Sequence, residues 1–164
     1  MTFATTFDLS HYRRVAVLGI GNELNGDDAA GVLVARALKA CIEQGGARSA
    51  AAVLSLEAGA APESFTGVLR RFQPDLVIFA DAAHLDQAAG SVAWIAWQNT
   101  VGLSASTHTL PPSVLAEYLI HELGCDIVLI GIQPKSIEFD APVSAEVQIA
   151  VDQIVANLLL QWKN

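Results

Sequence analysis

The sequence predicts an α/β protein with three layers: a twisted, mostly parallel sheet of about five strands, flanked by helices on both faces. Short apolar runs such as Val15–Ile20 and Leu76–Ala80 are bounded by glycine, proline or aspartate, which is typical of strands covered on both faces. Segments with helical periodicity lie between these runs. Strands that alternate with helices are joined by right-handed crossovers, and this makes neighbouring strands parallel.

The first half of the chain alternates strand and helix twice. The strand Val15–Ile20 ends in a glycine turn, and the helix Ala29–Ile42 that follows it ends at a Gly-Gly pair. A second, shorter strand is expected at Ala52–Leu56. The helix Ala61–Phe72 begins near a proline, which the first turn of a helix accommodates, and its apolar side chains share one face.

The middle of the chain holds the clearest strand. Leu76–Asp81 is a buried run that stops on a carboxylate. Val92–Trp97 is another strand with only a short connection before it, so we expect it to run antiparallel at an edge of the sheet. Residues 98–111 have the composition of a loop, rich in serine and threonine near their end.

The last third predicts two helices around one strand. The helix Pro112–Leu123 carries leucines at a spacing of four, Asp126–Ile132 is the last buried strand, and Val143–Trp162 is the longest helix, with a broad apolar stripe. Residues 1–12 are predicted to be an N-terminal extension that is loosely ordered.

Composition favours one soluble domain over residues 1–164. Of the 164 residues, 52% are hydrophobic and only 16% are charged, enough for a sizeable core. The net charge of −8 disfavours a nucleic-acid partner. No apolar run reaches the ~18–20 residues that span a bilayer, and no signal peptide is recognised. Two cysteines make no disulfide framework, so we expect a cytoplasmic protein. The oligomeric state stays unknown.

The turn between Gly19 and Gly31 carries the first candidate residues. Its four glycines allow a sharp bend, and Asp27 and Asp28 stand where the next helix begins. The turn has no lysine for a phosphate and no serine or cysteine nucleophile, which favours a metal or a proton over a nucleotide. An aspartate at a helix start also caps free N–H groups, but one cap suffices. We therefore assign Asp28 to function, and Asp27 to capping or to support of the side chains that carry the function.

Two further candidates lie outside this turn. Asp81 ends a core strand at the sheet edge where the Asp28 turn also emerges, although a lone aspartate there can simply cap the next turn. His108 lies in the loop before Pro111-Pro112, where a lone histidine is usually a surface residue. His84 is a secondary possibility. Two carboxylates and one imidazole form a three-ligand site that suits a divalent metal such as nickel or zinc, with positions open for an activated water.

Five segments together resemble the hydrogenase maturation proteases, the endopeptidases that trim the C-terminus of the nickel–iron hydrogenase large subunit. They occur in the family's order within residues 14–160: Gly19–Asn22, Gly26–Gly31, Ile78–Ala82, Thr107–Pro111 and Leu129–Pro134. The last two are most similar to the branch that processes hydrogenase 3. One departure is Ala58, which stands where the family commonly has a glycine.

The resemblance implies a function and a set of site residues. It implies a twisted, largely parallel sheet and metal binding by Asp28, Asp81 and His108. The metal would be nickel already inserted in the precursor of the large subunit, from which a short C-terminal peptide is cut. The same three residues would be catalytic, acting on a water nucleophile, since no Ser/His/Asp or Cys/His arrangement is recognised.

Two alternatives stay open at this point. A chaperone-like module that senses nickel in the precursor and cuts nothing needs the same ligands. A nucleotide-binding enzyme is the third possibility, because Gly19-Ile20-Gly21 partly matches a dinucleotide turn. The residues also leave open whether the metal is the catalyst or a recognition tag.

Overall fold

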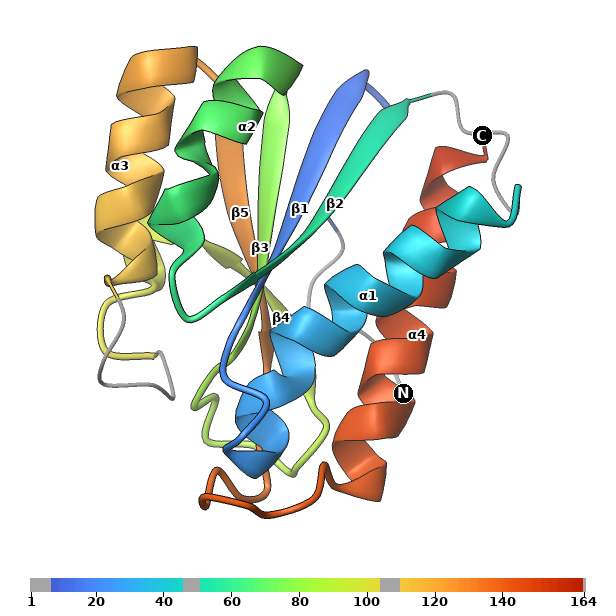
Figure 1. Cartoon of the computed structure of the whole chain (residues 1–164), viewed down its shortest axis with the longest axis vertical. Helices are drawn as coiled ribbons and strands as arrows, with labels where there is room; N and C mark the ends of the chain where they lie inside the picture. The colour runs from blue at the N-terminus through green and yellow to red at the C-terminus, as the bar shows by residue number, and fades with distance from the viewer. Residues whose placement is uncertain (1–6, 46–50, 104–109, 164) are drawn as a thin grey trace.

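The computed structural model describes residues 7–45, 51–103 and 110–163. Within these ranges the chain forms five strands and four α-helices, which alternate except that the fourth strand follows the third directly (Figure 1). The strands are β1 (Arg14–Ile20), β2 (Ala52–Gly59), β3 (Leu76–Ala82), β4 (Val92–Ala96) and β5 (Asp126–Ile132). The helices are α1 (Ala30–Glu43), α2 (Thr66–Phe72), α3 (Pro112–Leu123) and α4 (Ala145–Trp162). Three short 3-10 helices are η1 (Gly26–Ala29), η2 (Pro62–Phe65) and η3 (Trp97–Asn99).

The strands form one sheet in the order β2-β1-β3-β5-β4. Four of them are parallel, whereas β4 pairs antiparallel with β5, with Trp94 opposite Ile130. This confirms the predicted fold class and the antiparallel edge strand. The short link between β3 and β4 contains no crossover helix, and a parallel pair would need one.

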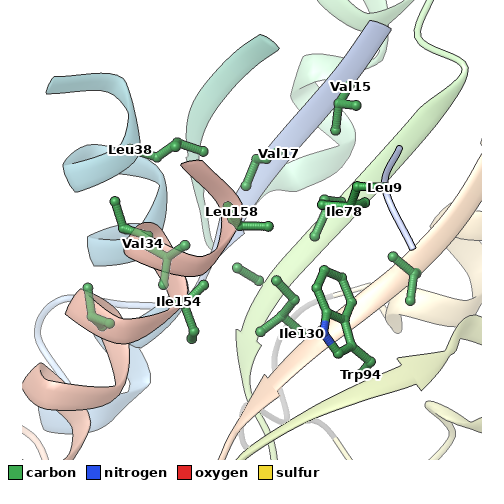
Figure 2. Packing of buried hydrophobic residues seen from close by; sticks show 14 of the residues in the cluster. Leu9, Val15, Val17, Val34, Leu38, Ile78, Trp94, Ile130, Ile154 and Leu158 are labelled. Atoms are coloured by element: carbon green, nitrogen blue, oxygen red, sulfur yellow. The ribbon is translucent and has the colours of Figure 1, made fainter. Parts of the chain in front are cut away.

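Helices cover both faces of the sheet, as the apolar runs require. Alternate residues of each strand point to opposite faces. One face packs against α1 and α4, and the other against α2 and α3 (Figure 1). Figure 2 shows the first of these layers, in which α1 and α4 meet β1, β3 and β5 through Val34, Leu38, Ile154, Leu158, Val17, Ile78 and Ile130.

The prediction of a loosely ordered N-terminal extension is wrong for residues 7–12. Leu9 is 1% exposed and belongs to the core cluster that α1 and α4 cover (Figure 2). The Tyr12 hydroxyl donates a hydrogen bond of 2.7 Å to Asp126 Oδ2. The sequence does not reveal this burial, because Leu9 and Tyr12 stand in a mostly polar stretch and show no helix or strand periodicity.

Several boundaries differ from the expectation by a few residues. The strand expected at 52–56 continues to Gly59, because β1 extends the pairing as far as Ile20 opposite Gly59. Trp97 was expected in a strand but begins η3. The last helix begins at Ala145, where Ser144 caps it by accepting a hydrogen bond from the Val147 amide. Among the described residues, no helix combines the length and the apolar character that crossing a bilayer requires.

Candidate functional site

The carboxyl ends of β1 and β3 form the centre of the candidate site. β1 lies between β2 and β3, and the crossovers from β1 to β2 and from β2 to β3 use helices on opposite faces of the sheet. Such a switch point leaves a crevice at the carboxyl ends of the strands, where open α/β sheets bind ligands. Gly19 of β1 pairs with Ala80 of β3, and η1 contacts β3. Asp28 in η1 and Asp81 in β3 therefore emerge at the same edge, as predicted.

Asp28 is a buried carboxylate with few donors. It is 2% exposed, and its Oδ2 accepts one hydrogen bond of 3.0 Å from the Asn22 amide. Its Oδ1 has no hydrogen-bond partner within the described part of the chain. Burial raises the pKa of Asp28 above its ordinary value, and the bond from Asn22 counteracts only part of this rise. A buried acceptor oxygen without a donor is what a cation or a proton would satisfy.

Asp81 reaches the same crevice from β3. It is 2% exposed and lies opposite Gly131 of β5 in the parallel ladder. Strand alternation places it on the face of Val77 and Phe79, the face that α2 and α3 cover. Because α3 begins at the carboxyl edge of the sheet (Figure 1), Asp81 faces the layer in which that helix starts.

The third predicted ligand, His108, lies outside the described residues. Leu103 is the last described residue before His108, and its carbonyl accepts a hydrogen bond of 2.9 Å from the amide of His84. His84 itself lies three residues after Asp81. After His108, Pro112 begins α3. The His84 side chain is exposed. In the ranges that the structure describes, no three histidine, cysteine or acidic side chains are grouped to hold a metal, and His108 is not among them.

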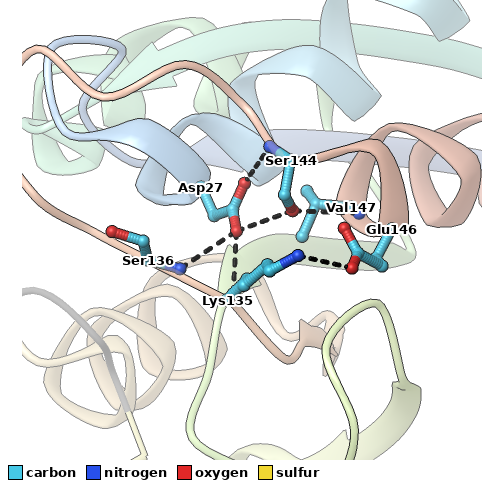
Figure 3. Close-up of polar contacts among 6 residues, drawn as sticks. All are labelled: Asp27, Lys135, Ser136, Ser144, Glu146 and Val147. Carbon is cyan, nitrogen blue, oxygen red and sulfur yellow. Dashed lines mark hydrogen bonds and ion pairs between the residues drawn. The ribbon is translucent and has the colours of Figure 1, made fainter.

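Asp27 does not cap a helix, so that part of its assignment is wrong. Neither η1 nor α1 has a side-chain cap. Asp27 is 0% exposed, and its carboxylate accepts hydrogen bonds from the residues that connect β5 to α4 (Figure 3). These partners are more than a hundred positions away along the chain, so no local pattern reveals them.

The glycines of the turn are packed against the protein's own backbone. Gly21 has φ +140°, and a Cβ there would lie 1.8 Å from the Asp28 carbonyl oxygen. A Cβ on Gly31 would lie 2.0 Å from the Ala80 carbonyl oxygen. The glycines thus let η1 and α1 approach β1 and β3 closely. This use of the glycines disfavours the dinucleotide interpretation, in which they would make room for a pyrophosphate, because Gly21 and Gly31 lie against carbonyl oxygens of the chain itself.

A cleft of about 510 Å³ opens beside the turn, between Gly21-Asn22 and Gly59-Ala60. Glu23 and Glu57 line it as well, and both contact Arg36 at 2.7 Å. The sequence does not single out these three charged residues, since they lie in the turn after β1, in α1 and in β2, and no spacing links them. Asn22, whose amide donates a hydrogen bond to Asp28, is one of the residues that line this cleft.

Comparison with known proteins gives one consistent relationship. The family described as hydrogenase maturation protease matches residues 32–161. A Methanocaldococcus jannaschii protein assigned to that family is 35% identical over 152 residues, 92% of this chain and 89% of that protein. Hydrogenase 3 maturation protease of Escherichia coli K12 is 26% identical, covering 87% of this chain and 86% of that protein. The crystal structure of the NiFe hydrogenase maturation protease HycI from Thermococcus kodakarensis has a TM-score of 0.83 at 36% identity, over 96% of this chain and 97% of that one.

Proposed function

This chain belongs to the hydrogenase maturation protease family, and from that membership we propose that it removes the C-terminal extension of a nickel-loaded hydrogenase large-subunit precursor. The protease assignment follows from the family and from the relatives that share the fold over nearly the whole chain. The nickel, the precursor's extension and the residues that engage them are our proposal.

The observation that carries the proposal is the pair of buried carboxylates at the β1/β3 switch point. Asp28 lies in η1, which follows β1, and Asp81 lies in β3, the parallel neighbour of β1, so both emerge at one edge of the sheet. A carboxylate oxygen of Asp28 lacks a hydrogen bond within the described residues, which suits a cation supplied by the substrate. His108, which precedes α3 in the sequence, would complete the donor set, since α3 covers the face of the sheet on which Asp81 lies. Carboxylate oxygens with an imidazole nitrogen suit a borderline divalent metal such as nickel.

The chain's own residues would act in two ways. Asp28, Asp81 and His108 would bind the nickel of the precursor and so orient the adjoining C-terminal segment. A carboxylate would then accept the proton of the water that attacks the scissile carbonyl. Asp28 suits this second role, because its Oδ1 is buried and has no hydrogen-bond donor among the described residues. The nickel would supply polarisation of the water or of the carbonyl.

We place this activity in the cytoplasm. The acidic net charge of −8 and the two free cysteines, Cys41 and Cys125, support this location.

The proposal is tested with the precursor itself. Purified protein is incubated with nickel-loaded precursor and, in parallel, with nickel-free precursor, and intact mass is followed over time. We expect a single mass loss at the C-terminus of the nickel-loaded form and none in the nickel-free form. Binding without any mass loss would contradict the proposal and favour a chaperone-like role. Equal cleavage of both forms would contradict the recognition of nickel.

A further inference from the structure

We propose that Asp27 is a positioning residue, which holds the Asp28 carboxylate in place by tying its turn to the loop between β5 and α4. This β5–α4 loop comprises residues 133–144. The inference rests on the proposed function, in which Asp28 engages the precursor. Asp27 itself touches neither the metal nor the scissile bond in this proposal.

The Asp27 carboxylate has a full set of donors (Figure 3). Its Oδ2 accepts hydrogen bonds from the Lys135 amide at 2.7 Å, the Ser136 amide at 3.2 Å and the Ser144 hydroxyl at 2.8 Å. Its Oδ1 accepts one from the Ser144 amide at 2.7 Å. The donors come from both ends of the β5–α4 loop, so that one side chain closes the loop onto the turn.

A second set of bonds joins the same two segments through their backbones. The Asp27 amide donates to the Ser136 carbonyl at 2.9 Å, and the Asp140 amide donates to the Leu24 carbonyl at 2.7 Å. Gly26 has φ +54°, and a Cβ there would lie 2.7 Å from the Ser136 carbonyl oxygen. The turn and the loop are therefore packed backbone against backbone, with Asp27 at the centre of the contact.

The chemistry of these contacts requires a carboxylate. An ionised side chain that is 0% exposed is tolerated only where several donors surround it, and charge-assisted bonds are stronger than neutral ones. All four contacts are donors that point at the side chain, so an amide at this position would turn at least one N–H toward another donor. A helix cap would need only one such bond.

This arrangement bears on the reaction because Asp28 is the next residue in η1. Its backbone is joined directly to that of Asp27, and the Asn22 amide is the one donor to its Oδ2 among the described residues. Groups that orient a metal-binding side chain typically change activity by about 10- to 100-fold when they are replaced. We therefore expect loss of the Asp27 contacts to act on turnover through the position of Asp28.

The test compares three variants in precursor cleavage. Asp27→Asn should lower kcat by about 10- to 100-fold while KM stays within about threefold. Ser144→Ala, which removes only one of the four contacts, should lower kcat less. Ser136→Ala is the matched control, since Asp27 binds the Ser136 backbone amide, and this variant should cleave like the wild type. A rise in KM with kcat retained, or wild-type kinetics in Asp27→Asn, would overturn the proposal.

A second measurement reports the position of Asp28 without any cleavage. The Asn22 amide donates to Asp28 Oδ2, so its hydrogen exchange is protected only while that carboxylate is in place. Asp27→Asn should accelerate hydrogen exchange at the Asn22 amide and leave the exchange of core amides in β3 unchanged. If Asp27→Asn does not fold, Ser144→Ala is measured instead and should also accelerate exchange at Asn22. Unchanged exchange at Asn22 would overturn the positioning role. If wild-type protein cuts no precursor, the proposed function fails, and the exchange data alone decide the positioning role.

Discussion

The two adjacent aspartates of the turn after β1 have opposite surroundings. Asp27 accepts four hydrogen bonds, whereas Asp28 accepts one and keeps an oxygen without a donor in the described structure. Both are buried to the same degree. Both side-chain oxygens of Asp27 therefore have donors, whereas burial makes the anionic form of Asp28 costly. Such a local cost is typical of a functional group.

Replacing Asp28 tests this difference directly. Asp28→Asn should abolish precursor processing and leave the free energy of unfolding unchanged or higher by up to about 2 kcal/mol, because a neutral amide is less costly to bury. Mass spectrometry of the precursor and urea unfolding of the variant measure the two effects. Normal processing by the variant would contradict the proposed role of Asp28.

The stability effect of Asp28 should depend on pH. Burial raises the folded-state pKa of Asp28 above its unfolded value, so the folded protein binds that proton more tightly. The carboxyl therefore favours folding at low pH, and this contribution is lost as the pH rises through the folded-state pKa. The advantage of Asp28→Asn over wild type should be smallest at about pH 4, close to the pKa of an unfolded aspartate, and should grow as the pH is raised. Urea unfolding of both proteins at several pH values from about 4 upward measures this advantage. A difference in the free energy of unfolding that stays constant with pH would contradict the rise in the pKa of Asp28.

His108 calls for a separate test, because it lies outside the described residues. His108→Ala should change the melting temperature by no more than about 2 °C and abolish binding of the nickel-loaded precursor. His121→Ala on α3 is the control, since its side chain is exposed in the last turn of that helix. Pull-down of nickel-loaded precursor and thermal unfolding provide the two measurements. A large loss of thermal stability in His108→Ala would indicate a structural histidine instead.

At the scale of elements, the close packing of α1 on β1 and β3 brings the site together. Gly31 in the first turn of α1 lies against the Ala80 carbonyl, one residue before Asp81. A larger residue there would push η1 and Asp28 away from the end of β3.

Ala58 stands where the family commonly has a glycine, but its own backbone does not require one. It lies within β2 and has no positive φ, whereas Gly59 beside it has φ +63°.

Two helical glycines give a matched pair for this packing. Gly31→Ala should lower the free energy of unfolding by about 2 kcal/mol or more, because its Cβ would lie 2.0 Å from a backbone oxygen. Gly67→Ala in α2 should be neutral or stabilising by up to about 1 kcal/mol, since only an arginine side-chain tip comes within 4 Å. Chemical denaturation of both variants measures the difference. Similar stabilities would contradict the close approach of α1.

At the scale of the molecule, the residues before β1 complete the core that α1 and α4 cover. Phe7 stacks on Trp94 of β4 with ring centroids 5.3 Å apart, and Leu9 is buried beside it. Tyr12 bonds to Asp126 at the start of β5. The segment therefore ties the start of the chain to β4 and β5, the two strands farthest from β2 in the sheet.

Removing one anchor of this segment should destabilise the whole domain. Leu9→Ala should lower the free energy of unfolding by about 2–4 kcal/mol, because Leu9 is 1% exposed. Leu160→Ala on α4, where the side chain is 62% exposed, is the control and should change it by less than about 0.5 kcal/mol. Urea unfolding of both variants measures the contrast. An unchanged stability in Leu9→Ala would show that residues 7–12 fold independently of the core.

The sequence by itself determined the order of strands and helices, the parallel sheet with one antiparallel edge strand, and the shared edge of Asp28 and Asp81. These follow from local periodicity, burial and the ends of strands, which depend on residues close together in the chain. Only the tertiary structure decided the role of Asp27, the burial of Leu9 and the cleft beside Arg36. Each of these depends on partners from distant elements, and a hydrogen bond between residues more than a hundred positions apart leaves no trace in local sequence.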